Sequence, residues 1–518
     1  MKKALVIANM LFASSTVFGM FNNPDDQSTS SGSRKRNISQ IGSEESSSRK
    51  RICKNSEDSN CSLQKDLLSF INSKNQATEL ILWAAKSNQQ GIIDYLIENN
   101  VDVNSTINGQ NSLYQAVFNK NLELADHLIL NGAKFNENDK ENLLFNAIYA
   151  NNLENVKYLI GKGVNIGYKS GCESFLDRAV SKKYFDIAKY LIENGAEVSR
   201  LPKSQVLSIA MEDNDLDFIK HLISSNYVSV NYMDTNKRTL LHNAVISNKF
   251  DIVKYLVNVK GININAQDNN SYTPLLYAAE KKQTNMAKFL IKKLVEEDNT
   301  GNALNITGGR FQKTPLYEAS SNGSLDIVKL LVRKGADFNK GASNDISPTE
   351  IAILNDHIDI VKYLIEHGVN VNETDSNGMS LLSLAIVTNS ENSVDLVNYL
   401  IEKGAKINRQ SIDGWTPLHE AVQAGNKEIV QILLDHDAFV NAADTNGWTP
   451  LHEASQNGNL GISKLLADNG ADAYASCSNK STPASIASNK RFADIVKYLS
   501  SDLQYYRFTS NRLAVHNK

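Results

Sequence analysis

Cysteine is scarce in this chain of 518 residues, which has four, at Cys53, Cys61, Cys172 and Cys477. Four cysteines so far apart exclude a disulfide framework and fit no zinc-binding pattern. We interpret Cys172 and Cys477 as single residues of the folded region. Cys53 and Cys61 lie in a polar segment, where they either pair with one another or remain separate thiols.

An excess of charge of one sign is also lacking. The 54 lysines and arginines nearly balance the 57 aspartates and glutamates, and the formal net charge is −3. Domains that bind nucleic acid usually carry an excess of basic residues on one face. The composition therefore gives no indication of direct nucleic-acid binding.

Long apolar runs are absent except at the N-terminus. Lys2 and Lys3 precede the mostly apolar segment 4–18, and Gly19 supplies a small residue where a signal peptidase cuts. We predict a bacterial-type signal peptide over residues 1–19, and hence a secreted protein. The alternatives are an uncleaved N-terminal anchor and a chance apolar start. No other run approaches the roughly 20 residues of a membrane span, so we expect no membrane contact after cleavage.

Residues 20–62 are rich in serine, asparagine and charge and show no apolar periodicity, which predicts a disordered tail. Two basic triplets, 34–36 and 49–51, are spaced as in a bipartite nuclear-localisation signal. Glu44 and Glu45 lie between them and partly offset their charge. An ordinary charged tail is therefore the alternative interpretation.

Proline is rare, but six of the eight prolines mark one repeated position. Two nearly identical strings, Asp413–Ala421 and Asn446–Ala454, start 33 residues apart and share the core Thr-Pro-Leu-His. More divergent versions of this core recur at steps of 31 to 41 residues. Thirteen anchor positions are equivalent to its threonine: Glu79, Asn111, Asn142, Ser174, Gln205, Thr239, Thr273, Thr314, Ser347, Ser380, Thr416, Thr449 and Thr482.

The residue types fit two short helices per repeat. Threonine or serine at the anchor can cap a helix, and proline suits the first helical position, where no amide hydrogen bond is lost. Asn248 and Gly425 stand where that helix must end in the left-handed conformation. Segment 251–256 has the apolar spacing of a second helix. Glycines such as Gly404 then stop that second helix.

These features resemble the ankyrin-repeat family, in which a repeat of about 33 residues forms a β-turn finger and two helices. The resemblance implies an all-α solenoid of about 13 repeats over residues 75–500, in which each repeat contacts its neighbours. We expect a capping helix over 63–74, a loop insertion near 296–313, a shorter insertion at 389–393 and a C-terminal tail over 501–518.

Three apparent catalytic motifs fail on inspection. His419-Glu420 and His452-Glu453 begin like a zinc-protease motif but lack the second histidine four residues later. We expect these histidines to hydrogen-bond between neighbouring fingers. Segment 307–314 looks like a phosphate loop, but its glycines are at the wrong interval from the lysine. We therefore predict no catalytic residue, no metal and no cofactor.

The resemblance also implies where a partner binds. In ankyrin stacks the fingers and first helices line the concave face. The positions free to contact a partner there are the residue before the anchor, the residue after the histidine and the two before the first-helix terminator. Exposed aromatic residues are frequent interface anchors. The predicted protein-binding residues are Trp83, Tyr272, Tyr277, Glu318, Trp415, Glu420, Trp448 and Glu453.

Two alternatives apply to this surface. The tryptophans either anchor a partner or pack on the neighbouring finger. We expect Glu318, Glu350, Glu420 and Glu453 to form an acidic strip, which either meets a basic partner or stays solvated.

Asparagine is abundant and lysine greatly outnumbers arginine, which suggests an AT-rich genome. Together with the predicted signal peptide and the repeats, this composition resembles the secreted ankyrin-repeat proteins of host-associated intracellular bacteria. The resemblance implies a monomeric, non-enzymatic module that binds host proteins. The alternatives are a scaffold retained by the producing cell, in the periplasm or outside, and an enzyme with an unrecognised site.

Overall fold

The computed structural model describes residues 74–136, 139–170, 173–298, 300–343 and 345–500. Several predictions fall outside these residues: the signal peptide, the polar tail with Cys53 and Cys61, Cys172 and the C-terminal tail. Of the predicted capping helix 63–74, only Lys74 is described, and it is the first residue of the first repeat's helix.

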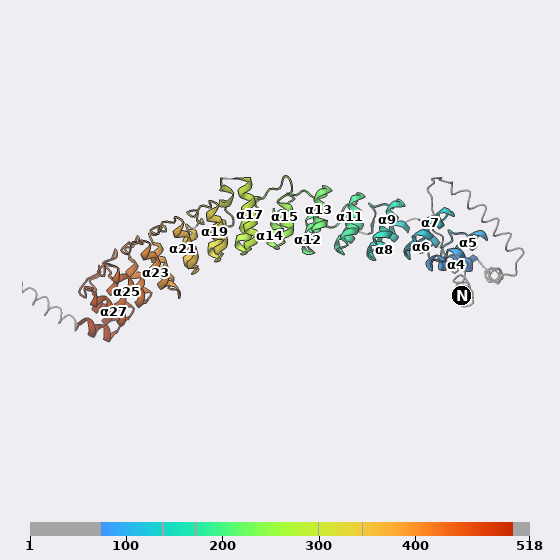
Figure 1. Ribbon diagram of the computed structural model, residues 1–518. Helices are drawn as coiled ribbons and strands as arrows, with labels where there is room; N and C mark the ends of the chain where they lie inside the picture. Colours follow the sequence, from blue (N-terminus) through green and yellow to red (C-terminus); the bar gives the residue numbers. More distant parts are fainter. Residues whose placement is uncertain (1–73, 137–138, 171–172, 299, 344, 501–518) are drawn as a thin grey trace, which may run out of the picture. The chain divides into compact units, whose positions relative to one another are not determined.

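The chain divides into two compact units, residues 1–202 and 203–518. The described part of the first unit holds four pairs of helices, side by side in Figure 1. These pairs are α4 (Lys74–Lys86) with α5 (Gln90–Glu98), α6 (Ser112–Phe118) with α7 (Leu122–Leu130), α8 (Asp139–Tyr149) with α9 (Leu153–Gly161), and α10 (Phe175–Ser181) with α11 (Phe185–Glu193).

The described part of the second unit holds nine further pairs, numbered as repeats five to thirteen. They are α12 (Lys203–Glu212) with α13 (Leu216–Ser224), α14 (Leu240–Ile246) with α15 (Phe250–Leu256), α16 (Pro274–Glu280) with α17 (Thr284–Glu297), α18 (Pro315–Ser321) with α19 (Leu325–Arg333), α20 (Pro348–Leu354) with α21 (Ile358–Glu366), α22 (Leu381–Thr388) with α23 (Ser393–Glu402), α24 (Pro417–Gln423) with α25 (Lys427–Asp435), α26 (Pro450–Gln456) with α27 (Leu460–Asp468), and α28 (Pro483–Asn489) with helical residues 493–500.

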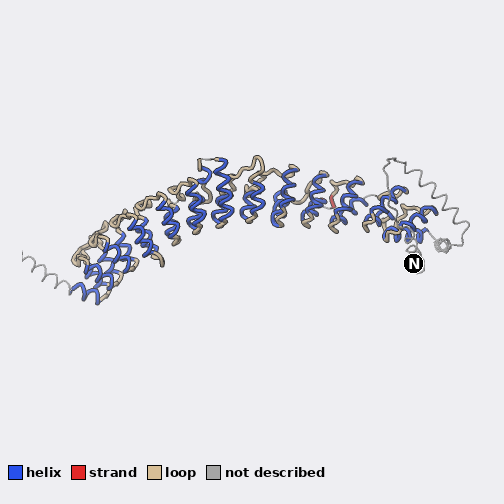
Figure 2. The backbone as a smooth tube through the Cα atoms, in the orientation of Figure 1, coloured by secondary structure: helices blue, strands red, loops and turns tan. Residues whose placement is uncertain are grey.

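Little of the described chain is strand, and Figure 2 shows loops joining the helices within each unit. In the first unit, β1 (Lys169–Ser170) pairs antiparallel with β2 (Glu173–Ser174). Isolated bridges such as Met233 with Thr239 close other fingers. The helices, together with the repeats, confirm the predicted all-α fold.

Packing between neighbours supplies the core. In the second unit α24 contacts its own second helix α25 and the first helices α22 and α26 on either side. The second helix α15 buries Ile252, Val253 and Leu256 completely. Full burial of such a side chain stabilises by about 1.5–3 kcal/mol. Because each repeat supplies several, the stack needs no single large core.

Ten of the thirteen anchors cap a first helix as predicted, including all eight from Thr239 to Thr482. The prediction is wrong at Glu79, Asn142 and Gln205, which lie inside α4, α8 and α12. The helices at these three anchors begin before the anchor and are longer, at 13, 11 and 10 residues.

The helix terminators adopt the predicted conformation. Gly425 has φ of 72° and Asn248 has φ of 54°, both in the left-handed region where glycine and asparagine are tolerated best. The shorter insertion is also confirmed. Asn389 ends α22 with φ of 42°, and the next helix begins at Ser393.

Much of the insertion near 296–313 is loop and turn, as predicted, but helix α17 runs into its start. Helix α17 runs for 14 residues, to Glu297, whereas α19 has nine. Leu290, Ile291 and Leu294 continue its buried stripe, and this apolar spacing carries the helix beyond its usual end. A 3₁₀ turn, η2 (Asn302–Asn305), and a bridge between Gly308 and Lys313 complete the insertion.

No helix in the described residues has both the length and the apolar content needed to cross a membrane.

Candidate protein-binding surface

A capping relay builds each regular finger. The backbone N–H of Thr416 donates to Nδ1 of His419 at 3.2 Å, and the Thr416 hydroxyl lies 2.9 Å from the same nitrogen. On the other side of the ring, Nε2 lies 3.1 Å from the carbonyl oxygen of Trp448 in the next finger. His452 repeats the arrangement with Thr449 and with the carbonyl oxygen of Ser481.

These contacts assign the tautomer of the histidine. Nδ1 accepts the backbone N–H, so the proton of the neutral ring is on Nε2, which donates to the next finger. Burial lowers the pKa of His419 and of His452 and keeps the rings neutral. The histidines therefore link neighbouring fingers, as predicted from the sequence.

The two finger tryptophans are half-buried and lean on these histidines. The ring centroids are 5.6 Å apart for Trp415 and His419 and 5.2 Å apart for Trp448 and His452. Each indole thus packs on a histidine of its own repeat, and its role as an anchor for a partner stays a prediction. Trp83, on α4, is half-buried as well.

The predicted acidic strip is wrong as a surface feature. Glu318, Glu420 and Glu453 are between 5% and 6% exposed, too little for a solvated strip. Glu350 also does not belong to the set. It occupies the histidine position, where its carboxylate accepts the Ser347 N–H at 2.6 Å in a capping box.

Each of the three buried glutamates has different surroundings. Glu318 accepts from Tyr272 Oη and pairs with Lys313, both at 3.2 Å. Glu453 accepts from the indole of Trp448 at 3.0 Å. Burial raises the pKa of Glu420 to about 7, and its Oε2 is buried with no hydrogen-bond partner among the described residues.

Tyr277 is also buried, at 7% exposure, contrary to the prediction of an accessible anchor. Its hydroxyl donates to Asp268 Oδ2 at 2.7 Å and accepts from Arg238 Nη2 at 3.1 Å. Its ring centroid lies 4.9 Å from that of Tyr272, which is half-buried. This network ties repeats six and seven together, so Tyr277 serves the fold.

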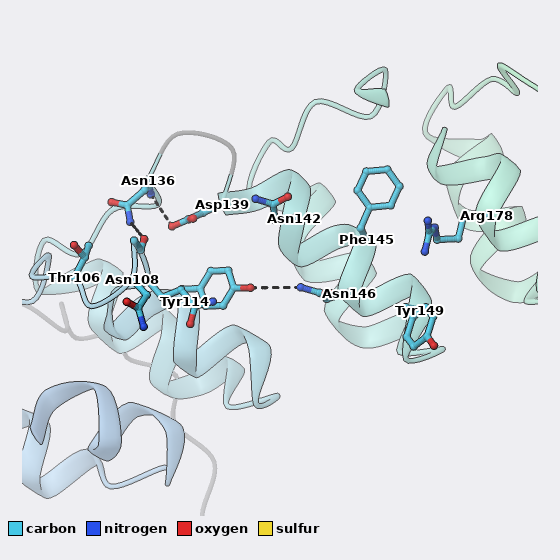
Figure 3. A pocket seen from close by; sticks show the side chains of 12 residues that line it. Thr106, Asn108, Tyr114, Asn136, Asp139, Asn142, Phe145, Asn146, Tyr149 and Arg178 are labelled. Atoms are coloured by element: carbon cyan, nitrogen blue, oxygen red, sulfur yellow. Dashed lines mark hydrogen bonds between the residues drawn. The ribbon is translucent and has the colours of Figure 1, made fainter. Parts of the chain in front are cut away.

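A hollow on the finger and first-helix surface of the first unit was not predicted from the sequence. This groove has a volume of about 930 Å³ and spans the second to fourth repeats (Figure 3). We call it the amide groove, after the side chains that line it. They are Thr106, Asn108, Gln110, Tyr114, Asn136, Asp139, Asn142, Phe145, Asn146, Tyr149 and Arg178, with Gly109.

Hydrogen bonds fix part of the lining. Asn146 Nδ2 donates to Tyr114 Oη at 3.4 Å, and Asn136 Nδ2 donates to the Gly109 carbonyl at 2.7 Å, as drawn in Figure 3. No described group hydrogen-bonds the side chains of Asn108 and Asn142, whose amides therefore face the groove unpaired.

Aromatic rings form the far wall of the amide groove. Phe145 and Tyr149 project from α8, and the guanidinium of Arg178, on α10, lies 5.3 Å from the Phe145 ring centroid (Figure 3). Arg178 is itself paired with Glu173 at 2.6 Å. The groove thus offers uncharged donors, uncharged acceptors and ring faces, which suit a polar segment of polypeptide.

The repeat register did contain a signal for this groove. Phe145, Asn146 and Tyr149 follow the anchor Asn142 by three, four and seven residues, at the histidine position, after it, and two before the terminator Asn151. The last two were among the positions assigned to partner contact. These positions hold asparagine and a single tyrosine, whereas the predicted binding residues are tryptophans, paired tyrosines and glutamates.

Comparisons with known proteins agree with this geometry. The family model for ankyrin repeats (three copies) matches five overlapping segments: 52–139, 113–201, 207–301, 316–411 and 382–477. Alpha-latrocrustotoxin-Lt1a of Latrodectus tredecimguttatus is 38% identical over 63 residues, which cover 12% of this chain and 4% of the toxin. This chain therefore matches only a small part of that relative.

The matched segments together span most of the chain, and the helix pairs, capping residues and finger-to-finger histidines follow the same register. The chain belongs to the ankyrin-repeat family, and its repeats point to a protein–protein interaction module.

Proposed function

We propose that this protein is a secreted, non-enzymatic effector of a host-associated bacterium and binds host proteins through its fingers and first helices. The observation that carries the binding role is the amide groove. It is open, it lies on the surface that ankyrin repeats use for partners, and it presents unpaired amides of Asn108 and Asn142 beside exposed Tyr149.

The chemistry of the groove supports binding over catalysis. Its ionisable side chains are Asp139, Arg178 and two tyrosines, and Arg178 is already paired with Glu173. Asp139 is buried and accepts the backbone N–H of Asn136 at 3.1 Å. These groups stabilise the groove, and the amides remain to read a partner's backbone or polar side chains.

Secretion and a host target rest on the sequence. The apolar segment 4–18 behind Lys2 and Lys3 supports export, and the composition supports a host-associated origin. Delivery into the host cell follows from the same resemblance. The basic triplets 34–36 and 49–51 would then direct nuclear import as an additional property.

Fractionation of producing cells with infected host cells, using an epitope tag at the C-terminus, tests the localisation. The proposal expects tagged protein in the host fraction, shortened by the signal peptide. Retention in the periplasm would favour the scaffold alternative. Affinity capture from host lysate with the mature chain then tests binding, and capture of no host protein above an unrelated ankyrin control would contradict the proposal.

A further inference from the structure

Repeats nine and ten of the second unit carry a set of apolar side chains that the repeat fold does not require. We call Ile346, Ile351, Leu354, Met379, Leu384 and Val387 the apolar patch. They occupy the three partner-contact positions: before the anchor, after the histidine position and two before the terminator. Helices α20 and α22 pack directly together, so equivalent residues lie side by side.

The patch is accessible. Leu354 is 43% exposed and Val387 is 48% exposed, and the other four are half-buried. In the flanking repeats, Ser321 and Gln423 hold the position of Leu354 and Val387. Polar residues therefore satisfy the fold there, and large exposed apolar residues in adjacent repeats point to a contact surface.

Aspartates border the patch on its finger side. The finger tips 342–346, 375–379 and 411–415 contain no lysine or arginine, and each carries one aspartate: Asp345, Asp375 and Asp413. Asp345 and Asp413 are exposed and Asp375 is half-buried, whereas Glu350 and Glu420 on the adjoining helices are buried. No lysine or arginine of the described chain forms a salt bridge with these three aspartates, so the finger side of the patch is acidic.

The spacing of the patch fits a helix. Packed helices lie about 8–10 Å apart, which sets the separation of Leu354 and Val387. Two turns of an α-helix rise about 10.5 Å over seven residues, so apolar side chains at i and i+7 match the two repeats. The residues at i+3 and i+4 of that partner helix then contact Ile351 and Leu384.

We propose that the apolar patch binds an amphipathic helix whose apolar stripe is bordered by lysine or arginine. The inference rests on the proposed function and names the chemistry of one partner. Apolar contacts supply the affinity. The carboxylates favour a helix whose apolar stripe is bordered by basic residues over one bordered by acidic residues. Trp415, in the next finger, continues the row of Ile346 and Met379 and extends the surface toward repeat eleven.

The test uses two synthetic helix-forming peptides of 18 residues, with leucines on one face and either lysines or glutamates along its borders. Binding to the full chain is measured by fluorescence anisotropy at two salt concentrations. We expect the lysine peptide to bind and the glutamate peptide to bind at least about tenfold more weakly. Failure of the lysine peptide to bind, or equal binding of both peptides, would overturn the inference.

A double variant, Leu354→Ser with Val387→Ser, separates the patch from general attraction to the chain. The variant should weaken lysine-peptide binding by about tenfold or more and leave the melting temperature unchanged, because both side chains are exposed. The matched control, Leu130→Ser with Phe439→Ser, removes two other exposed apolar residues and should bind as wild type. Equal affinity of the double variant and wild type overturns the inference.

Host capture distinguishes the two proposals. If the wild-type chain and the double variant capture the same host proteins equally, the inference fails and the proposed function stands. If neither chain captures a host protein, but the lysine peptide binds the wild-type chain more tightly than the double variant, the proposed function fails and the inference about the patch stands.

Discussion

The indole N–H of Trp448 donates a 3.0 Å hydrogen bond to the carboxylate of Glu453, five residues later in the same repeat. The equivalent pair in the preceding repeat, Trp415 and Glu420, lacks this bond, and Glu420 Oε2 is buried without a partner among the described residues. Two strings with nearly identical sequence thus make different local contacts. Trp448 supports a buried carboxylate, whereas Trp415 does not.

The two tryptophans should therefore differ in their effect on stability. Trp448→Ala removes a hydrogen bond to a buried carboxylate and should lower the free energy of unfolding by about 1.5–3 kcal/mol beyond the loss of packing. Trp415→Ala loses packing alone. Urea unfolding followed by circular dichroism at pH 7 measures both variants, and equal losses would contradict this assignment.

Glu420 should make stability fall as pH rises. Burial raises its pKa in the folded chain to about 7, against an ordinary value of 4.5. Between these values the folded chain holds a proton that the unfolded chain releases, so stability declines from pH 4.5 to pH 7. Glu420→Gln removes this penalty and should stabilise by up to about 3 kcal/mol above pH 7, with little difference below pH 4.5.

Glu373 provides the matched comparison for this titration. Burial, and then the nearby charge of Glu350, raise its pKa to about 7 as well. Glu373→Gln should therefore reduce the decline of stability with pH over the same window. The double variant, Glu373→Gln with Glu420→Gln, should reduce it further. Urea midpoints at pH 5, 6, 7 and 8 give the slopes. Slopes parallel to wild type in both single variants would show that neither carboxyl holds its proton.

The fold was largely predictable because particular residues mark where the first helix of most repeats begins and ends. An anchor followed by proline, as at Thr416, fixed the helix start, and the nine-residue step to Gly425 fixed its end. The prediction failed at Asn142, which lies inside α8, and in α17, where apolar residues continued the helical spacing beyond the usual end. Capping residues can be recognised in the sequence. Where they do not cap, packing against the neighbouring helices decides where the helix begins or ends.

The candidate site was less predictable, because exposure depends on the neighbouring repeats. Glu318 and Tyr277 hold positions that are usually free for a partner, yet contacts with the preceding or following repeat bury them. Conversely, Asn142 and Leu354 are not aromatic and were not predicted as binding residues, although their side chains are exposed on the first helices α8 and α20. The repeat period and the residue type identify a side chain's position in its repeat. Its exposure to solvent also depends on the repeats on either side.

Asp177 should be the main acid-sensitive residue of the first unit. Burial alone would raise its pKa. Hydrogen bonds from Ser174, Leu201 and Ser199 outweigh that effect and lower the pKa to about 2. The stability it supplies is complete above its ordinary value of 3.8 and is lost as pH falls from 3.8 to 2.

Asp177→Asn tests this directly. It should lower the free energy of unfolding at pH 7 by about 2.5 kcal/mol, and the difference from wild type should shrink at pH 3. Asp186→Asn, at an exposed helix position, serves as the control and should change stability little at either pH. A difference for Asp177→Asn that stays constant from pH 7 to pH 3 would mean that its charge is not what stabilises the turn.

Tyr149 should matter for binding and not for folding. It is 65% exposed at the wall of the amide groove, and its removal leaves no buried cavity. Tyr149→Ala should therefore keep the melting temperature of wild type and reduce capture of a partner that uses the groove by about tenfold, as expected for a central aromatic contact. Leu130→Ala, at 85% exposure on the second helix α7, is the control for loss of an exposed apolar residue away from the groove. Quantitative capture from host lysate compares the three chains, and equal loss in both variants, or none in either, would remove the groove from the binding surface.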